Sequence, residues 1–136
     1  MGGQPVILLD SHVLVWQVVQ PERLSRAAAS AIRGARRNQG IAVAAISLWE
    51  LVRLFWQGHV KGRGSVEASV RALIDESGAV VKPITPEIAA LAWQFPDDFP
   101  HDPADRLIAA TARADGMTLI THDQRIRRCP LLKTLW

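Results

Sequence analysis

The sequence predicts an α/β fold: a single-domain, three-layer α/β/α sandwich built around a short parallel sheet. Two observations lead to this prediction. Short apolar segments alternate with longer helical segments along the chain, as expected for parallel strands joined by helical crossovers. The short segments are also apolar at nearly every position, as in strands that helices cover on both faces. The length of 136 residues suits one domain spanning residues 1–136.

Five strands are expected, and turn residues or helix-capping residues bound them. They span residues 6–9, 41–44, 79–82, 117–121 and 133–136. The expected helices start near residue 12 and then cover residues 26–37, 47–57, 65–77, 86–95 and 103–115, with one further helical turn before the last strand. Ser25 is a predicted N-cap, and Thr85 and Asp102 are each followed by a proline suited to the first helical position.

Composition sets limits on the class of protein. An apolar fraction of 49% with 21% charged residues describes an ordinary globular protein. The N-terminal stretch lacks the basic head and long apolar run of a signal peptide, and the single cysteine, Cys129, cannot form an internal disulfide; a reducing cytoplasm is expected. The net charge of +3 is compatible with a nucleic-acid partner. Basic residues gather in two places: Arg33, Arg36 and Arg37, and then Arg125, Arg127, Arg128 and Lys133.

Four acidic residues lie on a helix or where a strand passes into a helix: Asp10, Glu50, Asp105 and Asp123. In parallel sheets ligands gather beyond the carboxyl ends of the strands, which is where Asp10 and Asp123 are expected. Two carboxylates about 4 Å apart repel by roughly 4 kcal/mol at an effective dielectric constant near 20. A pocket that collects them persists by binding protons or hard cations, so convergence of the four predicts a metal-dependent active site.

Each acid also has a structural explanation. Asp10 could serve only as a helix N-cap, and Asp123 could be only a turn residue. Asp102 can cap its helix, which leaves Asp105 surplus to capping; we therefore assign Asp105 to the metal and Asp102 to the cap or the outer shell of the site.

Hydroxyl groups stand beside the first and last of these acids. Ser11 and Thr121 could hydrogen-bond the carboxylates or metal-bound water, or they could satisfy backbone groups alone.

Glu50 lies on a helix that is apolar almost all round, which predicts that this helix is buried on most sides. Glu50, Arg53 and Gln57 form its narrow polar stripe. The structural explanation is an ion pair between Glu50 and Arg53 at the surface, and the functional one is a metal cation. The five tryptophans are expected mostly in the core, with Trp136 a candidate for covering a surface or a partner.

Four segments together resemble the PIN-domain ribonucleases, and within them the VapC-type toxins of bacterial toxin–antitoxin pairs. They are residues 8–16 (LLDSHVLVW), 45–51 (AISLWEL), 101–109 (HDPADRLIA) and 119–123 (LITHD). The resemblance implies a PIN-like fold in which Asp10, Glu50, Asp105 and Asp123 form a metal-binding acidic quartet. Ser11 and Thr121 match the hydroxyl positions beside the quartet, and Arg106 would have a structural or substrate-side role.

The resemblance also implies an activity and partners. The activity is Mg²⁺- or Mn²⁺-dependent hydrolysis of RNA that leaves a 5′-phosphate and a 3′-hydroxyl. Arg33, Arg36 and Arg37 would hold flanking phosphates. A cognate VapB-like antitoxin would lay a segment across the active site and an apolar helix beside residues 49–56, and a homodimer is expected.

Other classes of function compete with this interpretation. A phosphorylatable receiver domain would need paired acids after the first strand and a lysine after a late strand, and neither is present. A phosphatase with an aspartate nucleophile would need a second aspartate where His12 stands. A non-catalytic RNA-binding module stays open, because a fold does not fix a function.

Overall fold

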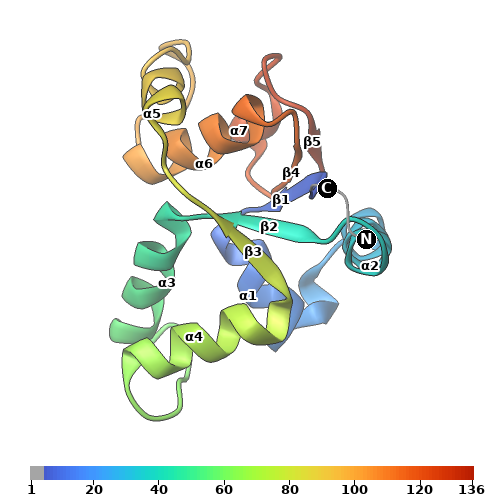
Figure 1. Ribbon diagram of the computed structural model, residues 1–136, viewed down its shortest axis with the longest axis vertical. Helices are drawn as coiled ribbons and strands as arrows, with labels where there is room; N and C mark the ends of the chain where they lie inside the picture. Colours follow the sequence, from blue (N-terminus) through green and yellow to red (C-terminus); the bar gives the residue numbers. More distant parts are fainter. Residues whose placement is uncertain (1–4) are drawn as a thin grey trace.

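A five-stranded parallel sheet forms the centre of the molecule in the computed structural model, which describes residues 5–136. In pairing order its strands are β3 (Ala79–Lys82), β2 (Ile41–Ala44), β1 (Ile7–Leu9), β4 (Thr118–Ile120) and β5 (Thr134–Leu135) (Figure 1). All five predicted strands are confirmed, with ends within one residue of the predicted ones. Residues 1–4, part of the stretch considered for a targeting signal, lie outside the described residues.

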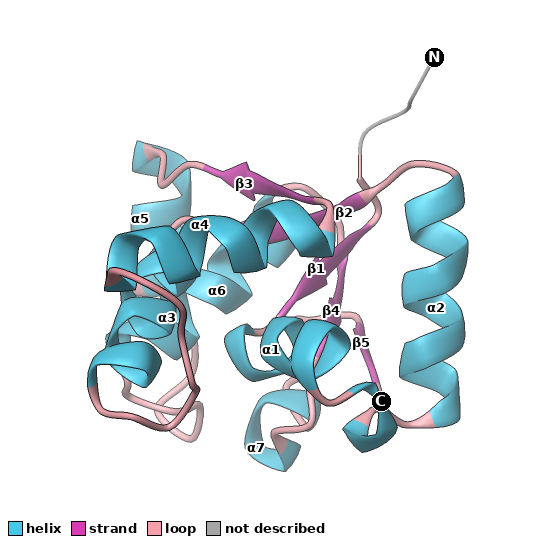
Figure 2. Ribbon diagram, turned by 90° about the horizontal axis from the view of Figure 1, so that it is seen from below, coloured by secondary structure: helices cyan, strands magenta, loops and turns pink. Residues whose placement is uncertain are grey.

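Helices connect the strands and, with the sheet, form three layers. They are α1 (Ser11–Val19), α2 (Arg26–Arg37), α3 (Ile46–Trp56), α4 (Val66–Ser77), α5 (Pro86–Ala92), α6 (Pro103–Ala114) and α7 (Gln124–Arg127), with a short 3₁₀ turn at Pro21–Arg23. In Figure 2, α1 and α4 lie in front of the sheet and α6 lies behind it. Among the described residues, no helix has both the length and the apolarity needed to cross a membrane.

The helix starts follow the predicted capping residues. The Oγ of Ser25 accepts from the N–H of Ala28, and the Oγ1 of Thr85 accepts from the N–H of Ile88. Asp102 caps α6 in the same way, so these three predictions are confirmed. The predicted start of α3 at Ser47 is one residue from the observed start at Ile46; the helix begins without a side-chain cap, and Ser47 is buried.

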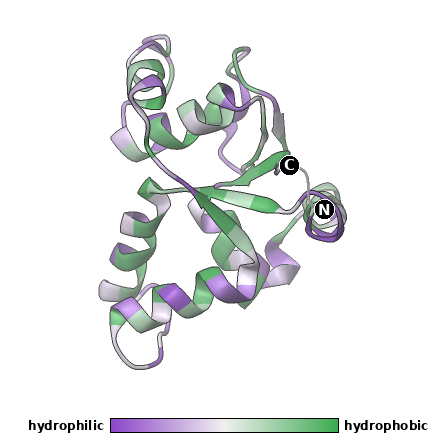
Figure 3. Ribbon diagram, in the orientation of Figure 1, coloured by the Kyte–Doolittle hydropathy of each residue, from purple (hydrophilic) through white to green (hydrophobic). Residues whose placement is uncertain are grey.

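Alternate residues of the strands supply two cores. Ile7 and Leu9 face the core under α1, α2, α3 and α4, while Leu8 faces the core under α5, α6 and α7. The inner strands β1 and β2 are therefore covered on both faces, which explains why they are apolar at every position (Figure 3). The predicted three-layer α/β/α architecture is confirmed.

The burial predicted for α3 is wrong. Only Ser47, Leu51 and Leu54 of this helix are buried, and Trp49 and Trp56 are 62% and 79% exposed. Trp93 is 88% exposed, so the prediction that most tryptophans lie in the core fails as well. The reason is geometric: α3 packs against the sheet and α4 with one side, and its other apolar side stays on the surface.

We expect Ile108→Ala to destabilise the protein by about 2–5 kcal/mol, because Ile108 is completely buried in the core beneath α6. Ile84→Ala is the matched control, since Ile84 is 45% exposed, and its effect should stay within about 0.5 kcal/mol. Urea denaturation of both variants measures the difference. Equal destabilisation by the two substitutions would contradict the core described above.

Candidate active site

The candidate site lies at the carboxyl ends of β1, β2 and β4. The chain leaves β1 towards β2 on one side, while β4 pairs with the other side of β1. Such a switch in strand order opens a crevice beyond the strand ends, where ligands of α/β proteins bind. Asp10 follows the last residue of β1, and Thr121 follows the last residue of β4, so the two flank this crevice.

Asp10 is fixed across the switch point. One carboxylate oxygen, Oδ1, accepts from the Ser11 N–H at 2.8 Å, and the other, Oδ2, accepts from the Thr121 hydroxyl at 2.8 Å. Its own N–H donates to the carbonyl of Ile120 at 3.1 Å. Asp10 is therefore the N-cap of α1, which is the structural role that the sequence allowed for it. Thr121 also holds the Asp10 side chain towards β4.

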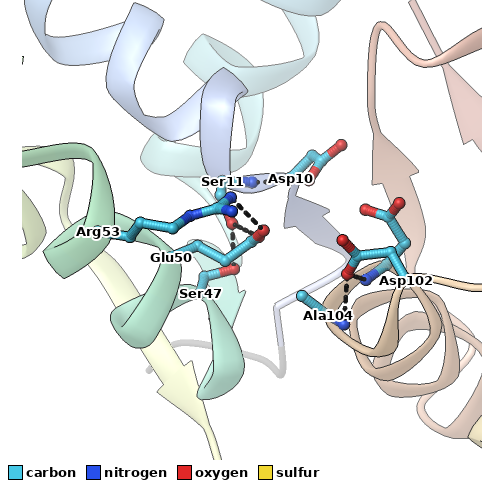
Figure 4. A network of polar contacts seen from close by, with 8 residues as sticks. Asp10, Ser11, Ser47, Glu50, Arg53, Asp102 and Ala104 are labelled. Atoms are coloured by element: carbon cyan, nitrogen blue, oxygen red, sulfur yellow. Dashed lines mark hydrogen bonds and ion pairs between the residues drawn. The ribbon is translucent and has the colours of Figure 1, made fainter. Parts of the chain in front are cut away.

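Glu50 reaches the same edge from the second turn of α3. The Ser11 hydroxyl donates to Glu50 Oε1 at 2.7 Å and lies 2.8 Å from the hydroxyl oxygen of Ser47 (Figure 4). The ion pair considered for Glu50 is present: Arg53 Nη2 lies 3.6 Å from Glu50 Oε2. Ser47 was not predicted as a neighbour of the site. Its position three residues before Glu50, on the same face of one helix, could have identified it.

Asp105 enters the site from the start of α6. Because α6 runs back towards the amino end of β4, its first turn lies at the carboxyl edge of the sheet, with Asp102 as its cap. Asp102 Oδ1 accepts from the N–H groups of Ala104 and Asp105 at 2.7 and 3.3 Å. Asp105 is thus free of the capping role.

Arg106 holds the loop that precedes α6. Its guanidinium donates to the carbonyls of Pro100 at 2.9 Å and Ala92 at 3.3 Å, and reaches those of Pro96 and Phe99 at 3.5 Å. These bonds tie the end of α5 to the segment that carries Asp102. They favour the structural role over the substrate-side role for Arg106.

Asp123 lies at the rim of the site as the N-cap of α7. Its Oδ1 accepts from the N–H groups of Arg125 and Ile126 at 2.8 and 3.3 Å. Its own N–H donates to the Thr121 hydroxyl oxygen at 3.1 Å, the same hydroxyl that donates to Asp10. The Thr121 side chain therefore links the two acids across the crevice.

Three carboxyl groups of the site have raised pKa values. Burial raises the pKa of Asp105 to about 7; the further causes are the negative charges of Asp10, Asp102, Glu50 and Asp123. Burial is also the main reason that the pKa of Asp10 is raised, although its hydrogen bonds with Thr121 and Ser11 oppose the rise. For Glu50, burial and the charges of Asp10 and Asp102 raise the pKa against the opposing effects of Ser11 and Arg53. The acids therefore act on one another, as convergence requires.

The donor set suits a hard divalent cation. Carboxylate and hydroxyl oxygens are the ligands of Mg²⁺ and Mn²⁺, and a bound cation would offset both the burial and the mutual repulsion of these negative charges. In the described part of the chain, no three Asp, Glu, His or Cys side chains stand close enough to enclose an ion by themselves. An ion held here would therefore bind one or two of these carboxylates, and water or substrate phosphate would have to complete its shell.

Arg33, Arg36 and Arg37 lie far from the carboxylates. They are exposed on the last turns of α2, which leads directly into the amino end of β2. Arg36 also lies beside Gly78, the residue before β3. These arginines therefore stand at the edge of the sheet opposite the site, and phosphates held there would be remote from the scissile bond.

Residues 7–131 match the family model described as PIN domain. The chain belongs to the PIN-domain family. This PIN domain is 44% identical over 132 residues to Ribonuclease VapC22 of Mycobacterium tuberculosis (strain ATCC 25618 / H37Rv), covering 96% of this chain and 98% of that protein. The resemblance predicted from four segments is confirmed, and the receiver and phosphatase alternatives fall away.

Solved structures share the fold of this PIN domain. VapBC2 from Rickettsia felis, bound to a DNA fragment from its promoter, matches with a TM-score of 0.71 and 17% identity over 95% of this chain and 96% of that one. A toxin–antitoxin complex from Klebsiella pneumoniae matches with a TM-score of 0.66 and 18% identity over 96% of both chains. At such identities these likenesses bear on the architecture alone.

We expect Asp105→Asn to stabilise the PIN domain at neutral pH when a chelator is present. Between about pH 4 and 7 the folded protein keeps a proton on Asp105 that the unfolded chain has lost, so this group makes stability fall as pH rises through that window. Because the side chain is partly exposed, solvent screens much of the penalty, and the gain at pH 8 should be about 1–2 kcal/mol. Thermal unfolding from pH 4 to pH 8 measures it.

Asp75→Asn is the control for this experiment, because Asp75 is exposed on α4. It should leave the pH dependence unchanged. Added Mn²⁺ should raise the melting temperature of the parent protein more than that of Asp105→Asn, since the cation replaces the proton on the carboxylate. A variant that is less stable than the parent at pH 8 in chelator would contradict the electrostatic account.

Proposed function

We propose that this PIN domain, a single nuclease unit, is a metal-dependent endoribonuclease and the toxin of a toxin–antitoxin pair. The main support is the half-buried Asp105 carboxyl, whose pKa is raised to about 7 by burial and by four other carboxylates acting on it. A structural ion pair would lower the pKa of a carboxyl group, whereas a cluster of acids without its cation raises it. The relative named Ribonuclease VapC22 supports RNA as the substrate.

The residues of the site divide into ion ligands and residues that orient them. Asp10, Glu50 and Asp105 would bind Mg²⁺ or Mn²⁺ through one or two carboxylates at a time, with Asp123 at the rim as a further ligand. Thr121 orients Asp10, and Ser11 orients Glu50 while its N–H holds Asp10. Asp102 keeps the first turn of α6 in place, and so fixes the direction of Asp105.

The proposed reaction is hydrolysis of an RNA phosphodiester. When bound, the divalent cation supplies a nucleophilic water at neutral pH and neutralises charge on the phosphoryl and leaving oxygens. The protein positions the scissile phosphate over the crevice between β1 and β4, and water attacks in line with the 3′ oxygen that leaves. The products are a 5′-phosphate and a 3′-hydroxyl, and no side chain becomes covalently attached.

The exposed side of α3 supports a protein partner. Trp49, Val52 and Trp56 form a solvent-facing apolar strip on this helix, and an apolar cleft of about 540 Å³ lies between α3 and α4. Exposed apolar patches of this kind mark protein interaction sites. We assign the strip and cleft to the apolar helix of a VapB-like antitoxin in the cytoplasm, in keeping with the complexes whose fold is shared. The expected homodimer would use other surfaces.

We expect Asp10→Asn and Asp105→Asn each to lower RNA cleavage about 100-fold or more, because both remove charge that holds the cation. Gel analysis of mixed RNA incubated with Mn²⁺ measures the rate. Asp75→Asn should cleave like the parent, and excess chelator should abolish cleavage until Mn²⁺ is restored. Cleavage that survives chelation, or survives in both site variants, would refute the assignment. RNA binding without any cleavage would indicate the non-catalytic module instead.

We also expect Trp56→Glu to weaken binding of the cognate antitoxin about 100-fold, because it places a charge in an apolar contact. Calorimetric titration of the antitoxin against each purified variant measures the dissociation constant. Trp93→Glu is the matched control: Trp93 is also largely exposed but lies after α5, so its effect should be small. If both variants lose antitoxin affinity equally, or only Trp93→Glu loses it, the antitoxin binds another surface.

A further inference from the structure

A cleft between α1 and α3 opens beside the carboxylates. It encloses about 530 Å³, within the range of roughly 300–1,000 Å³ typical of ligand pockets. Its lining includes six cationic or aromatic residues: His12, Trp16, Arg23, Arg53, His59 and Lys61. None of the described residues that line it is acidic. The acidic crevice thus has a cationic neighbour, which we call the α1–α3 cleft.

The α1–α3 cleft is continuous with the acidic site through two of its residues. His12 follows Ser11, whose hydroxyl donates to Glu50. Arg53 lines the cleft, and its guanidinium reaches Glu50 at 3.6 Å (Figure 4). A polynucleotide whose scissile phosphate lies at the carboxylates would therefore place its neighbouring nucleotides in this cleft.

The cleft contains a flat platform made by Trp16 and Arg23. The Arg23 guanidinium lies 4.5 Å from the centre of the Trp16 ring. The indole is itself held by ring contacts with His122 at 5.9 Å and Trp136 at 5.8 Å, so the platform has a fixed orientation. Unpaired bases stack on aromatic rings and on guanidinium planes, which duplexes and acidic peptides cannot do in the same way.

We propose that the α1–α3 cleft binds single-stranded RNA next to the scissile phosphate. Arg23, Arg53 and Lys61 hold phosphates, and the platform of Trp16 and Arg23 stacks one base. This inference rests on the proposed ribonuclease function and identifies the surface that receives the substrate. It also replaces the predicted phosphate contacts of Arg33, Arg36 and Arg37 with contacts at the edge of the sheet where the carboxylates lie.

Binding of a fluorescent single-stranded RNA oligonucleotide of mixed sequence tests the proposal. Anisotropy titrations in the Asp105→Asn background avoid cleavage, and several salt concentrations give the slope of log Kd against log salt. Arg23→Gln and Lys61→Gln should each weaken binding and reduce that slope by about 0.7, the value for one phosphate contact on a single strand. Trp16→Leu should weaken binding about tenfold, and Trp16→Phe should retain most of it.

Arg33→Gln and Arg36→Gln are the matched controls, because they remove the same charge at the opposite edge of the sheet. Both should leave the affinity and the salt slope unchanged. A larger loss of RNA affinity in the two α2 variants than in the cleft variants, or an equal loss at all four arginine and lysine positions, would overturn the proposal. Unchanged RNA affinity in the cleft variants with lost affinity for polyglutamate would assign the cleft to an acidic protein segment.

The outcome is separable from that of the nuclease test. If the parent protein binds RNA through the cleft but cleaves none, the proposed nuclease function is refuted and the proposed role of the cleft stands. If Arg23→Gln, Lys61→Gln and Trp16→Leu all cleave RNA with normal KM values, the nuclease function stands and the proposed role of the cleft is refuted. Melting temperatures equal to that of the parent, expected for the exposed Arg23 and Lys61, establish that the variants are folded.

Discussion

The burial of several carboxylates at one edge of a parallel sheet is the constraint around which this PIN domain is arranged. Asp10, Glu50 and Asp105 come from a strand end and two helices, and each has a raised pKa for which burial is the main cause. The surrounding polar groups hold these acids in place without neutralising them: Thr121 and Ser11 hydrogen-bond two of them, and Asp102 caps the helix that carries the third. Such an arrangement is suited to a cation that arrives from solution.

Much of the fold could be predicted because local signals dominate it. Strands buried on both faces are apolar throughout, and capping residues such as Ser25, Thr85 and Asp102 mark helix starts through their own hydrogen bonds. The edge at which Asp10 lies follows from the geometry of parallel strands. The hydrogen bonds of Ser11 and Thr121 to the acids were among the alternatives that the sequence allowed, and the structure selects them.

Other features depend on tertiary placement, which periodicity does not contain. An apolar face looks the same in sequence whether it meets the core or a partner, so periodicity predicted burial for Trp49 and Trp56, and only the family resemblance placed a partner beside them. Helical spacing groups Arg33 with Arg36 but does not say at which end of the sheet they lie. The effect of Asp10 on the pKa of Asp105 joins positions far apart in the chain, and it arises only in the assembled fold.

Arg53 connects the acidic site with the α1–α3 cleft. This side chain contacts Glu50 and also lines the neighbouring cleft. An anionic ligand that draws the guanidinium away would leave the Glu50 carboxylate without its cationic partner, and a divalent ion could then take that place. Reciprocity of binding free energies then requires that the ion also favour the anion. On the proposed function, this one arginine would link the binding of a polyanion to the binding of a metal.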